Sequence, residues 1–310
     1  MRELKIIYRS NSHAPFWVVA EKSGVWEKNG LKVDTSPQLV RRKAVESLRN
    51  GEIDLISGNH HNLYGPRAKS QADFVHLAQL GNLWTDNHMV VNGSIRTVQD
   101  LRGKRVAVDR LSSHAGLNAW LFLREEGLDF DKGEVQLVES DADRWSNEDR
   151  WKGVLKGDFD ATFVDTPNDL RAAAAGARVI PVRAMPMVRG VTLTTTMAYV
   201  RKNEDDIRKL VRGVVEGIHF FLTCKDETMT ILGESTKLAY RDGREVESVY
   251  NEWASFLERK PYPRPEAIAN VFTLAVRRDP DIAGFNPMAL WNTHYVRELD
   301  DSGFIDSLYR

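Results

Sequence analysis

The sequence has little cysteine. Its 310 residues include one, Cys224. A single thiol excludes a disulfide within the chain and every metal site that is built from paired cysteines. The scarcity of cysteine fits a reducing compartment without requiring one.

The sequence also lacks an excess of charge of either sign. The chain has 43 Lys and Arg residues against 44 Asp and Glu residues, for a formal net charge of -1. The basic residues are scattered, and no basic block alternates with aromatic residues as a nucleic-acid groove requires. No apolar stretch approaches the roughly 18 residues of a membrane span. We therefore expect no nucleic-acid partner and no membrane insertion.

The N-terminus lacks the features of a signal peptide. MRELKIIYRS enters a predicted strand directly, without a charged region, an apolar stretch or a small-residue cleavage site. If this start is native, we expect a cytoplasmic protein. If a signal peptide has been removed, we expect a periplasmic one.

What the sequence has is a regular alternation of short apolar runs and longer amphipathic stretches. The runs of the first half are LKIIY, LKVDTS and IDLIS, and the pattern starts again with RVAVDR, VQLVES and ATFVD. Strands that alternate with helices in this way predict βαβ units and mostly parallel sheets. Because a typical domain has about 100–200 residues, we expect two α/β lobes.

An internal repeat supports the division into two lobes. ESLRNGEIDLISG (46–58) and GVLKGDFDATFVD (153–165) share a frame close to Leu-x-x-Gly-x-x-Asp, in which glycine ends a helix before a strand begins. We place lobe one at residues 1–92 and 199–310, with a helical C-terminal tail. Lobe two then comprises residues 93–198.

Five stretches together resemble a known family. They are AEKSGVWEKNGLKVD (20–34), NGEIDLISG (50–58), SIRTVQDLRGKRVAV (94–108), KGDFDATFVD (156–165) and AYVRKNEDDIRKLVRGVVEG (198–217). In this order they resemble the type II periplasmic-binding-protein fold. Within that fold, the chain is similar to the nitrate/sulfonate/taurine-type substrate-binding proteins and to their hydroxymethylpyrimidine-phosphate synthase and aromatic sulfinate desulfinase relatives. The resemblance implies an α/β, two-lobed structure of mostly parallel sheets flanked by helices, with a ligand cleft between the lobes.

Candidate ligand-binding residues follow from the predicted strands. In open parallel sheets a ligand lies beyond the carboxyl ends of the strands. Four loops there supply the candidates: Asn11, Ser12 and His13; Asn59, His60, His61 and Arg67; Ser112, Ser113 and His114; and Asp165 and Thr166. Adjacent residues of an extended segment point to opposite sides, so one of His60 and His61 should face the ligand and the other should pack into lobe one.

Two of these loops suit an anionic ligand. The predicted helix start at Ser113 offers backbone N–H groups, a positive dipole end and the hydroxyls of Ser112 and Ser113, which favour a carboxylate, sulfonate or phosphate. An ordinary N-cap role for a serine there is about equally expected. Arg67 would bind the same groups through two hydrogen bonds, with a solvated surface position as the alternative.

Other residues are less specific. Trp17 and Trp84 would stack on an aromatic ligand, although a tryptophan in an amphipathic stretch more often belongs to the core. Threonines close to the returning crossover are expected as strand residues, with one or two of them reaching the cleft: Thr192, Thr194, Thr195 and Thr196.

Two functions remain. The first is a substrate-binding protein of an ABC-type transporter, with a small anionic, and in some cases aromatic, ligand and a permease as its partner. The alternative is a cytoplasmic enzyme on the same fold, such as a decarboxylase, a lyase or a pyrimidine-synthase-like enzyme. We favour ligand binding, because it is the commonest use of the fold.

The enzyme alternative assigns its chemistry to histidines. Either His60 or His61 acts as a general acid or base while Arg67 holds the acid group, or a divalent metal is bound by the set His13, His61, His114 and Asp165. That metal is the one cofactor that the sequence suggests. The resemblance also sets limits, because the desulfinases have a cysteine on the first cleft loop, where this chain has Asn11-Ser12-His13, and the synthases have a cysteine-rich iron-binding run that is missing here.

Overall fold

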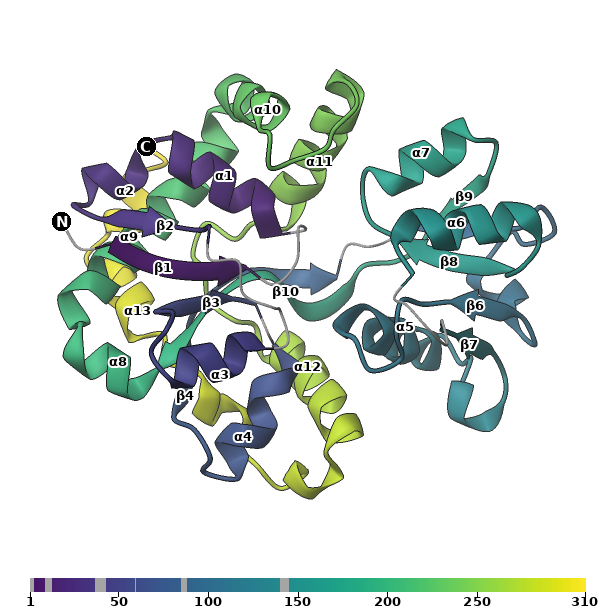
Figure 1. The fold of residues 1–310 in the computed structure, drawn as a ribbon, viewed down its shortest axis with the longest axis horizontal. Coiled ribbons are helices and arrows are strands. Elements are labelled where there is room, and N and C mark those ends of the chain that lie inside the picture. Colours follow the sequence, from purple (N-terminus) through teal and green to yellow (C-terminus); the bar gives the residue numbers. More distant parts are fainter. Residues whose placement is uncertain (1–2, 9–12, 37–42, 59, 85–87, 140–144) are drawn as a thin grey trace. The chain divides into compact units, whose positions relative to one another are not determined.

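The structure is a computed structural model that describes residues 3–8, 13–36, 43–58, 60–84, 88–139 and 145–310. The chain divides into two compact units. Unit 1 comprises Met1–Leu83 and Pro186–Arg310, and unit 2 comprises Trp84–Met185. Each unit has one five-stranded sheet with helices around it (Figure 1). The predicted two-lobed α/β class is confirmed, and the position of a ligand cleft stays a prediction.

The sheet of unit 1 has the strand order β2-β1-β3-β10-β4. Its strands are β1 (Glu3–Tyr8), β2 (Lys32–Asp34), β3 (Leu55–Ser57), β4 (Phe74–Trp84) and β10 (Met185–Thr196). Strand β1 pairs in parallel with β2 and β3, and β10 runs antiparallel to β3. Because Tyr8 lies opposite Ser57, the carboxyl ends of β1 and β3 meet at one edge of the sheet.

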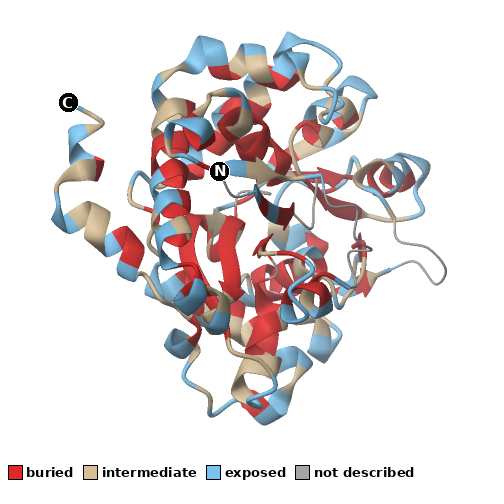
Figure 2. Ribbon diagram, turned by 60° about the vertical axis from the view of Figure 1, so that its left-hand side comes forward, coloured by how far each residue is buried: buried red, intermediate tan, exposed pale blue. Residues whose placement is uncertain are grey.

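Helices supply most of the remaining structure of unit 1. They are α1 (Ala14–Lys22), α2 (Val25–Lys28), α3 (Ala44–Arg49), α4 (Tyr64–Ala68), α8 (Met197–Lys202), α9 (Glu204–Thr223), α10 (Lys225–Glu234), α11 (Gly243–Phe256), α12 (Pro265–Arg278), α13 (His294–Asp301) and α14 (Phe304–Ser307). In Figure 2 the strands and the inner faces of these helices are largely buried, whereas the outer helix faces are exposed.

Helix α9 shows why the sequence folds this way. Its buried apolar residues recur every three or four positions: Ile207, Leu210, Val211, Val214, Val215, Ile218 and Phe221. This period places them on one stripe that packs against α1 and α2. Gly213 lets α9 come close, since a Cβ there would lie 2.8 Å from Cζ3 of Trp26. The long amphipathic stretch therefore serves the core of unit 1.

The sheet of unit 2 has the order β7-β6-β8-β5-β9. Its strands are β5 (His88–Val91), β6 (Arg105–Ala107), β7 (Gln136–Val138), β8 (Ala161–Val164) and β9 (Arg178–Pro181), and its helices are α5 (His114–Glu125), α6 (Asn147–Lys156) and α7 (Asn168–Ala174). Strand β6 is parallel to β7 and β8, whereas β5 is antiparallel to β8 and β9. Both sheets are therefore mixed, and less uniformly parallel than the sequence predicts, because returning strands insert between or beside the βαβ strands.

Trp84 belongs to the core of unit 2. Its side chain is buried, and its ring centroid lies 5.6 Å from that of Phe122 and 5.2 Å from that of Phe163. Contacts of this kind between aromatic rings account for a large share of core stability. Of the two roles considered for Trp84, the structure therefore supports the core position rather than stacking on an aromatic ligand.

The unit boundaries fall earlier in the chain than the sequence places them. The predicted limits were 92/93 and 198/199, whereas the structure divides at 83/84 and 185/186. Residues 88–91 pair with β8 and β9 inside unit 2, whereas β10 lies between β3 and β4 in the sheet of unit 1. Strand pairing decides to which unit each of these segments belongs. The periodicity of a short apolar run predicts a strand, but it does not show which sheet that strand joins. Among the described helices, none is both long and apolar enough to cross a membrane.

Candidate functional site

The carboxyl edge of β1 and β3 brings together three polar side chains from the start of α1 and the end of β3. His13 precedes α1, and Trp17 follows it by one helical turn, so both side chains lie on the same face of the helix. Ser57 is the last residue of β3. Its Oγ lies 3.2 Å from Nδ1 of His13 and accepts a hydrogen bond of 2.9 Å from Nε1 of Trp17. All three side chains are buried, so they form a polar cluster at the carboxyl edge of the unit 1 sheet.

Gly58 makes the close approach of the two loops possible. Its φ of +92° lies in the left-handed region, which favours glycine. A Cβ at this position would lie 2.4 Å from Cε1 of His13. The backbone N–H of Gly58 donates to the carbonyl of Thr192 on β10, 3.0 Å away. The loop is therefore tied to the sheet directly beneath the imidazole of His13.

The adjacent histidines have separate surroundings. The ring of His60 stacks on that of His13 with a centroid distance of 6.2 Å and an interplanar angle of 18°. Nε2 of His60 donates to the carbonyl of Gly190 at 3.3 Å. Nε2 of His61 instead lies 3.1 Å from Nη1 of Arg278, a donor at the end of α12. His60 therefore joins the cluster, whereas His61 packs toward α12.

A buried hydrogen-bond network supports this edge from below. Oγ1 of Thr194 donates to the carbonyl of Gly58 at 3.4 Å and lies 2.8 Å from Nδ1 of His76. Complete burial lowers the pKa of His76 to about 3, so its ring is neutral at neutral pH. Within the described residues Nε2 of His76 has no hydrogen-bond partner. The ring packs between Tyr64 and Trp291.

A glutamine completes the network on the neighbouring strand. The side-chain amide of Gln79 donates to the carbonyls of Gly81 and Arg189, and its oxygen accepts from the hydroxyl of Thr192. These bonds join β4 to β10 beside Gly190, the residue that His60 contacts. Thr192 and Thr194 are thus the strand threonines that support the site, and both are fully buried.

Sequence analysis missed His76, Gln79 and Arg278. The first two lie in FVHLAQLGNLW, where polar side chains interrupt an apolar strand. A polar residue inside such a strand requires a buried hydrogen-bond partner, and that requirement is a signal that the sequence contains. Arg278 lies 217 positions after His61, and no local pattern predicts their contact.

Arg67 lies on α4, half-buried. Across the described residues its guanidinium has no hydrogen bond and no ion pair. Its role as an anion ligand stays a prediction. Three predicted ligand residues lie outside the residues that the structure describes: Asn11, Ser12 and Asn59.

In unit 2, Ser113 is the N-cap of α5. Its Oγ accepts from the backbone N–H of Gly116 at 3.0 Å and donates to the carboxylate of Asp109. Glu139 contributes a second carboxylate, which accepts from the N–H of Leu111 at 2.5 Å. Ser113 therefore has the structural role that was weighed against ligand binding, and two negative charges beside it weaken the attraction of this helix start for an anion. Ser112 is exposed, and His114 begins α5 half-buried.

Asp165 follows β8 and belongs to an amide network. Its Oδ1 accepts from the side chains of Asn147 and Asn168, each at 2.8 Å. Arg150 donates to Oδ1 of Asn147 at 2.6 Å, so this network is itself anchored by a buried guanidinium. Thr166 is half-buried next to Asp165.

The predicted metal ligands divide between the units. His13 and His61 belong to unit 1, and His114 and Asp165 belong to unit 2. Over the described parts of the chain, no group of three or more His, Cys, Asp or Glu side chains is arranged to hold a metal ion. Nε2 of His61 also lies beside a guanidinium, which disfavours a second cation there. Neither unit by itself therefore supplies the predicted set.

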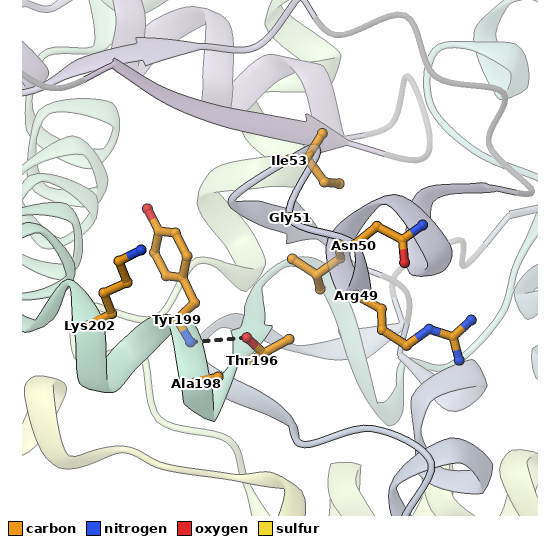
Figure 3. Close-up of a pocket in the computed structure, with 9 residues that line it drawn as sticks. Arg49, Asn50, Gly51, Ile53, Thr196, Ala198, Tyr199 and Lys202 are labelled. Carbon is orange, nitrogen blue, oxygen red and sulfur yellow. Dashed lines mark hydrogen bonds between the residues drawn. The ribbon is translucent and has the colours of Figure 1, made fainter.

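A surface cavity of about 250 Å³ lies at the other edge of the unit 1 sheet. Its lining comes from the end of α3, the turn before β3, the end of β10 and helix α8: Leu48, Arg49, Asn50, Gly51, Ile53, Thr196, Ala198, Tyr199 and Lys202. Figure 3 shows the side chain of Arg49 extending away from Tyr199 and Lys202, so the two cations do not converge on one point. The cavity is therefore a weaker candidate for an anion than the edge that holds His13 and His60.

Solved structures of low sequence identity share this fold. A sulfonate ABC transporter periplasmic sulfonate-binding protein SsuA from Methylobacillus flagellatus KT, described as putative, matches with a TM-score of 0.70 and 16% identity, over 98% of this chain and 96% of that chain. The periplasmic aliphatic sulphonate binding protein SsuA from Escherichia coli matches with a TM-score of 0.66 and 19% identity, over 91% and 88%. The desulfurization enzyme DSZB matches with a TM-score of 0.62 and 16% identity, over 96% and 99%.

Sequence comparison identifies the family. No curated protein sequence matches the chain significantly. The family model described as NMT1/THI5 like matches residues 10–227, which include the His13 and His60 loops, the whole of unit 2 and the whole of α9. The expected fold is confirmed, and the family is shown: the chain belongs to the NMT1/THI5-like family.

Proposed function

We propose that this protein is a substrate-binding protein that holds a small anionic ligand at the carboxyl edge of the unit 1 sheet. The ligand class is a carboxylate, a sulfonate or a phosphate. The observation that supports this most is the convergence of His13, Ser57 and His60 from two loops at that edge. Two proteins of the same fold are named as sulfonate-binding proteins, which supports the same ligand class.

The chemistry of the edge suits an oxyanion. Imidazole N–H groups and a guanidinium donate hydrogen bonds, and bonds from charged donors to oxyanions are the stronger kind. His13 and His60 supply the imidazoles, and Arg67 is the guanidinium we assign to the ligand. Because Nε2 of His60 donates to Gly190, we assign the contact with the ligand to its Nδ1, which donates in the imidazolium form. Trp17 and Ser57 orient His13 rather than contact the ligand, because their polar atoms bond to each other. Delivery to an ABC-type permease outside the cytoplasm is the role we infer, and an in-frame signal sequence in the gene would support it.

The histidine pair provides the test. We expect His60→Ala to weaken binding of an anionic ligand by about tenfold or more, because a hydrogen-bonding group of the site is lost. We expect His61→Ala to change that affinity by less than about twofold, within the usual effect of a distant substitution. Isothermal titration calorimetry with methanesulfonate, benzoate and inorganic phosphate measures both variants.

His61→Ala is the matched control for His60→Ala, since the two residues are adjacent and equally buried. His61→Ala removes the contact with Arg278 and should lower the thermal midpoint without lowering affinity. Equal losses of affinity in both variants would contradict the proposal that His60, rather than His61, contacts the ligand. Absence of binding for all three probes to the unaltered protein would contradict the anion class.

The second candidate is an enzyme on the same scaffold. It is favoured by the match to the desulfurization enzyme DSZB and by the paired buried imidazoles of His13 and His60. In this role His60 is the general acid or base and Arg67 the anchor of the acid group. The test is the release of sulfite from biphenyl-2-sulfinate or of carbon dioxide from an aromatic carboxylate. Release by the unaltered protein that is lost in His60→Ala would favour the enzyme. Stoichiometric binding without turnover favours the receptor.

A further inference from the structure

A second pair of acid–base side chains lies on the carboxyl edge of the unit 2 sheet. His88 begins β5, and the antiparallel register pairs it with Val164, the last residue of β8. Asp169 lies in the first turn of α7, which follows β8. Nδ1 of His88 is 3.6 Å from Oδ2 of Asp169. Sequence and fold therefore place an imidazole and a carboxylate side by side at the edge where this architecture binds ligands.

Asp169 differs from an ordinary acidic residue at a helix start. Such residues usually lie in solvent and stabilise the helix dipole. The side chain of Asp169 is only 9% exposed. In the part of unit 2 that the structure describes, its Oδ1 has no hydrogen-bond partner, and α7 has no side-chain cap. A buried carboxylate is costly unless a polar or charged group lies beside it, and Nδ1 of His88 is the group that lies beside Asp169.

The ring of His88 is more accessible than its partner. Its side chain is 34% exposed, nearly four times the fraction of Asp169. The Asp169 carboxylate, 3.6 Å from Nδ1, favours the tautomer with the proton on that nitrogen, because a negative charge attracts an N–H group and repels a lone pair. The lone pair is then on Nε2. An imidazole held in this way by a buried carboxylate is the arrangement that general bases use.

We propose that His88 and Asp169 form a proton-transfer dyad, in which His88 accepts an acidic proton from a bound small molecule and Asp169 is its positioning residue. The substrate class is a small oxygen or carbon acid. Nε2 of His88 forms a bond to the proton, and the O–H or C–H bond of the substrate breaks with its electron pair remaining on the substrate. The imidazolium that results is paired with the Asp169 carboxylate, and it returns the proton in a later step. The dyad is independent of the anion-binding role, which requires no proton transfer.

The tautomer of His88 tests the dyad. Nitrogen-15 NMR of the histidine-labelled protein at pH 8, with His88→Gln used to assign the signals, should show the neutral ring with its proton on Nδ1. In Asp169→Asn the amide can donate to Nδ1, so the proton should move to Nε2. A purely structural ion pair does not require this exchange of tautomers.

Carbethoxylation by diethyl pyrocarbonate gives a second readout, because the reagent reacts with an accessible imidazole lone pair. We expect the rate at His88, followed by peptide mass spectrometry, to fall by about tenfold or more in Asp169→Asn, because Nε2 then has the proton and no lone pair. Glu298→Gln is the matched control, since it removes a carboxylate beside a different histidine, His294. It should leave the tautomer and rate of His88 unchanged.

Either of two results overturns the proposal. One is a His88 ring with its proton on Nε2 in the unaltered protein. The other is an Asp169→Asn protein in which His88 keeps both its tautomer and its carbethoxylation rate. The first measurement uses the unaltered protein, so it decides the question even if the variant fails to fold.

Discussion

Gly58→Ala is expected to lower the free energy of unfolding by about 3 kcal/mol, as the sum of backbone strain and a steric clash. The strain arises because the φ of +92° suits glycine. The clash arises because the new Cβ would lie 2.4 Å from Cε1 of His13. The ring must then leave its place beside Ser57 and His60, so binding of methanesulfonate or benzoate should fall with stability. Urea unfolding and calorimetry measure the two effects.

Gly51→Ala separates strain from clash. Gly51 also has a positive φ, +74°, but a Cβ there would meet no atom within 4 Å. Its substitution should therefore cost only about 1 kcal/mol, the conformational term alone. The double variant His13→Ala/Gly58→Ala should recover part of the lost stability, because the smaller side chain removes the clash. Equal costs at Gly58 and Gly51, with no recovery in the double variant, would show that contact with His13 is unimportant.

Acidification is expected to destabilise the protein through His76. Burial lowers its pKa in the folded protein to about 3, whereas the unfolded chain has the ordinary value near 6.5. Between these values the unfolded state binds the extra proton, so stability is greatest above pH 6.5 and falls as the pH approaches 3. The linkage predicts a loss of about 2 kcal/mol between pH 7 and pH 5 from this residue.

The measurement is urea unfolding at pH 7 and pH 5 in paired variants. His76→Phe keeps an aromatic ring between Tyr64 and Trp291 but cannot be protonated, so its loss of stability should be about 2 kcal/mol smaller than that of the unaltered protein. Thr194→Val removes the hydrogen bond to Nδ1 and leaves His76 buried. It should keep the acid sensitivity, because burial rather than that bond lowers the pKa. An unchanged pH dependence in His76→Phe would contradict the linkage.

The histidine pair illustrates how far the sequence could predict the candidate site. Period-two alternation of an extended segment predicts that His60 and His61 have different surroundings. The two rings do have separate surroundings, but the segment is not extended, because His60 has helical dihedral angles and His61 begins a 3-10 helix. Which of them joins the cluster depends on Gly190 and Arg278, which lie 130 and 217 positions away. A local sequence pattern contains no information on contacts between residues so far apart in the chain. The sequence therefore could not predict which of the two rings joins the cluster.

The helix start at Ser113 shows a different limit. The sequence contains both interpretations, an anion site and an N-cap, with no local means of choosing between them. In the structure Ser113 is the cap, and the carboxylates of Asp109 and Glu139 lie beside it. Glu139 comes from the end of a neighbouring strand, so only the parallel pairing of β6 with β7 brings its charge to this helix.

The sequence by itself determined the α/β class, the two-lobe organisation and the family, because these follow from periodicity and from motif order along the chain. It also located the loops at the carboxyl ends of the strands. The tertiary structure alone decided the unit boundaries and the contacts of His13, His60 and His76. Strand pairing and buried hydrogen bonds join residues that are 40 to 217 positions apart here, and such pairings depend on the packing of the whole chain.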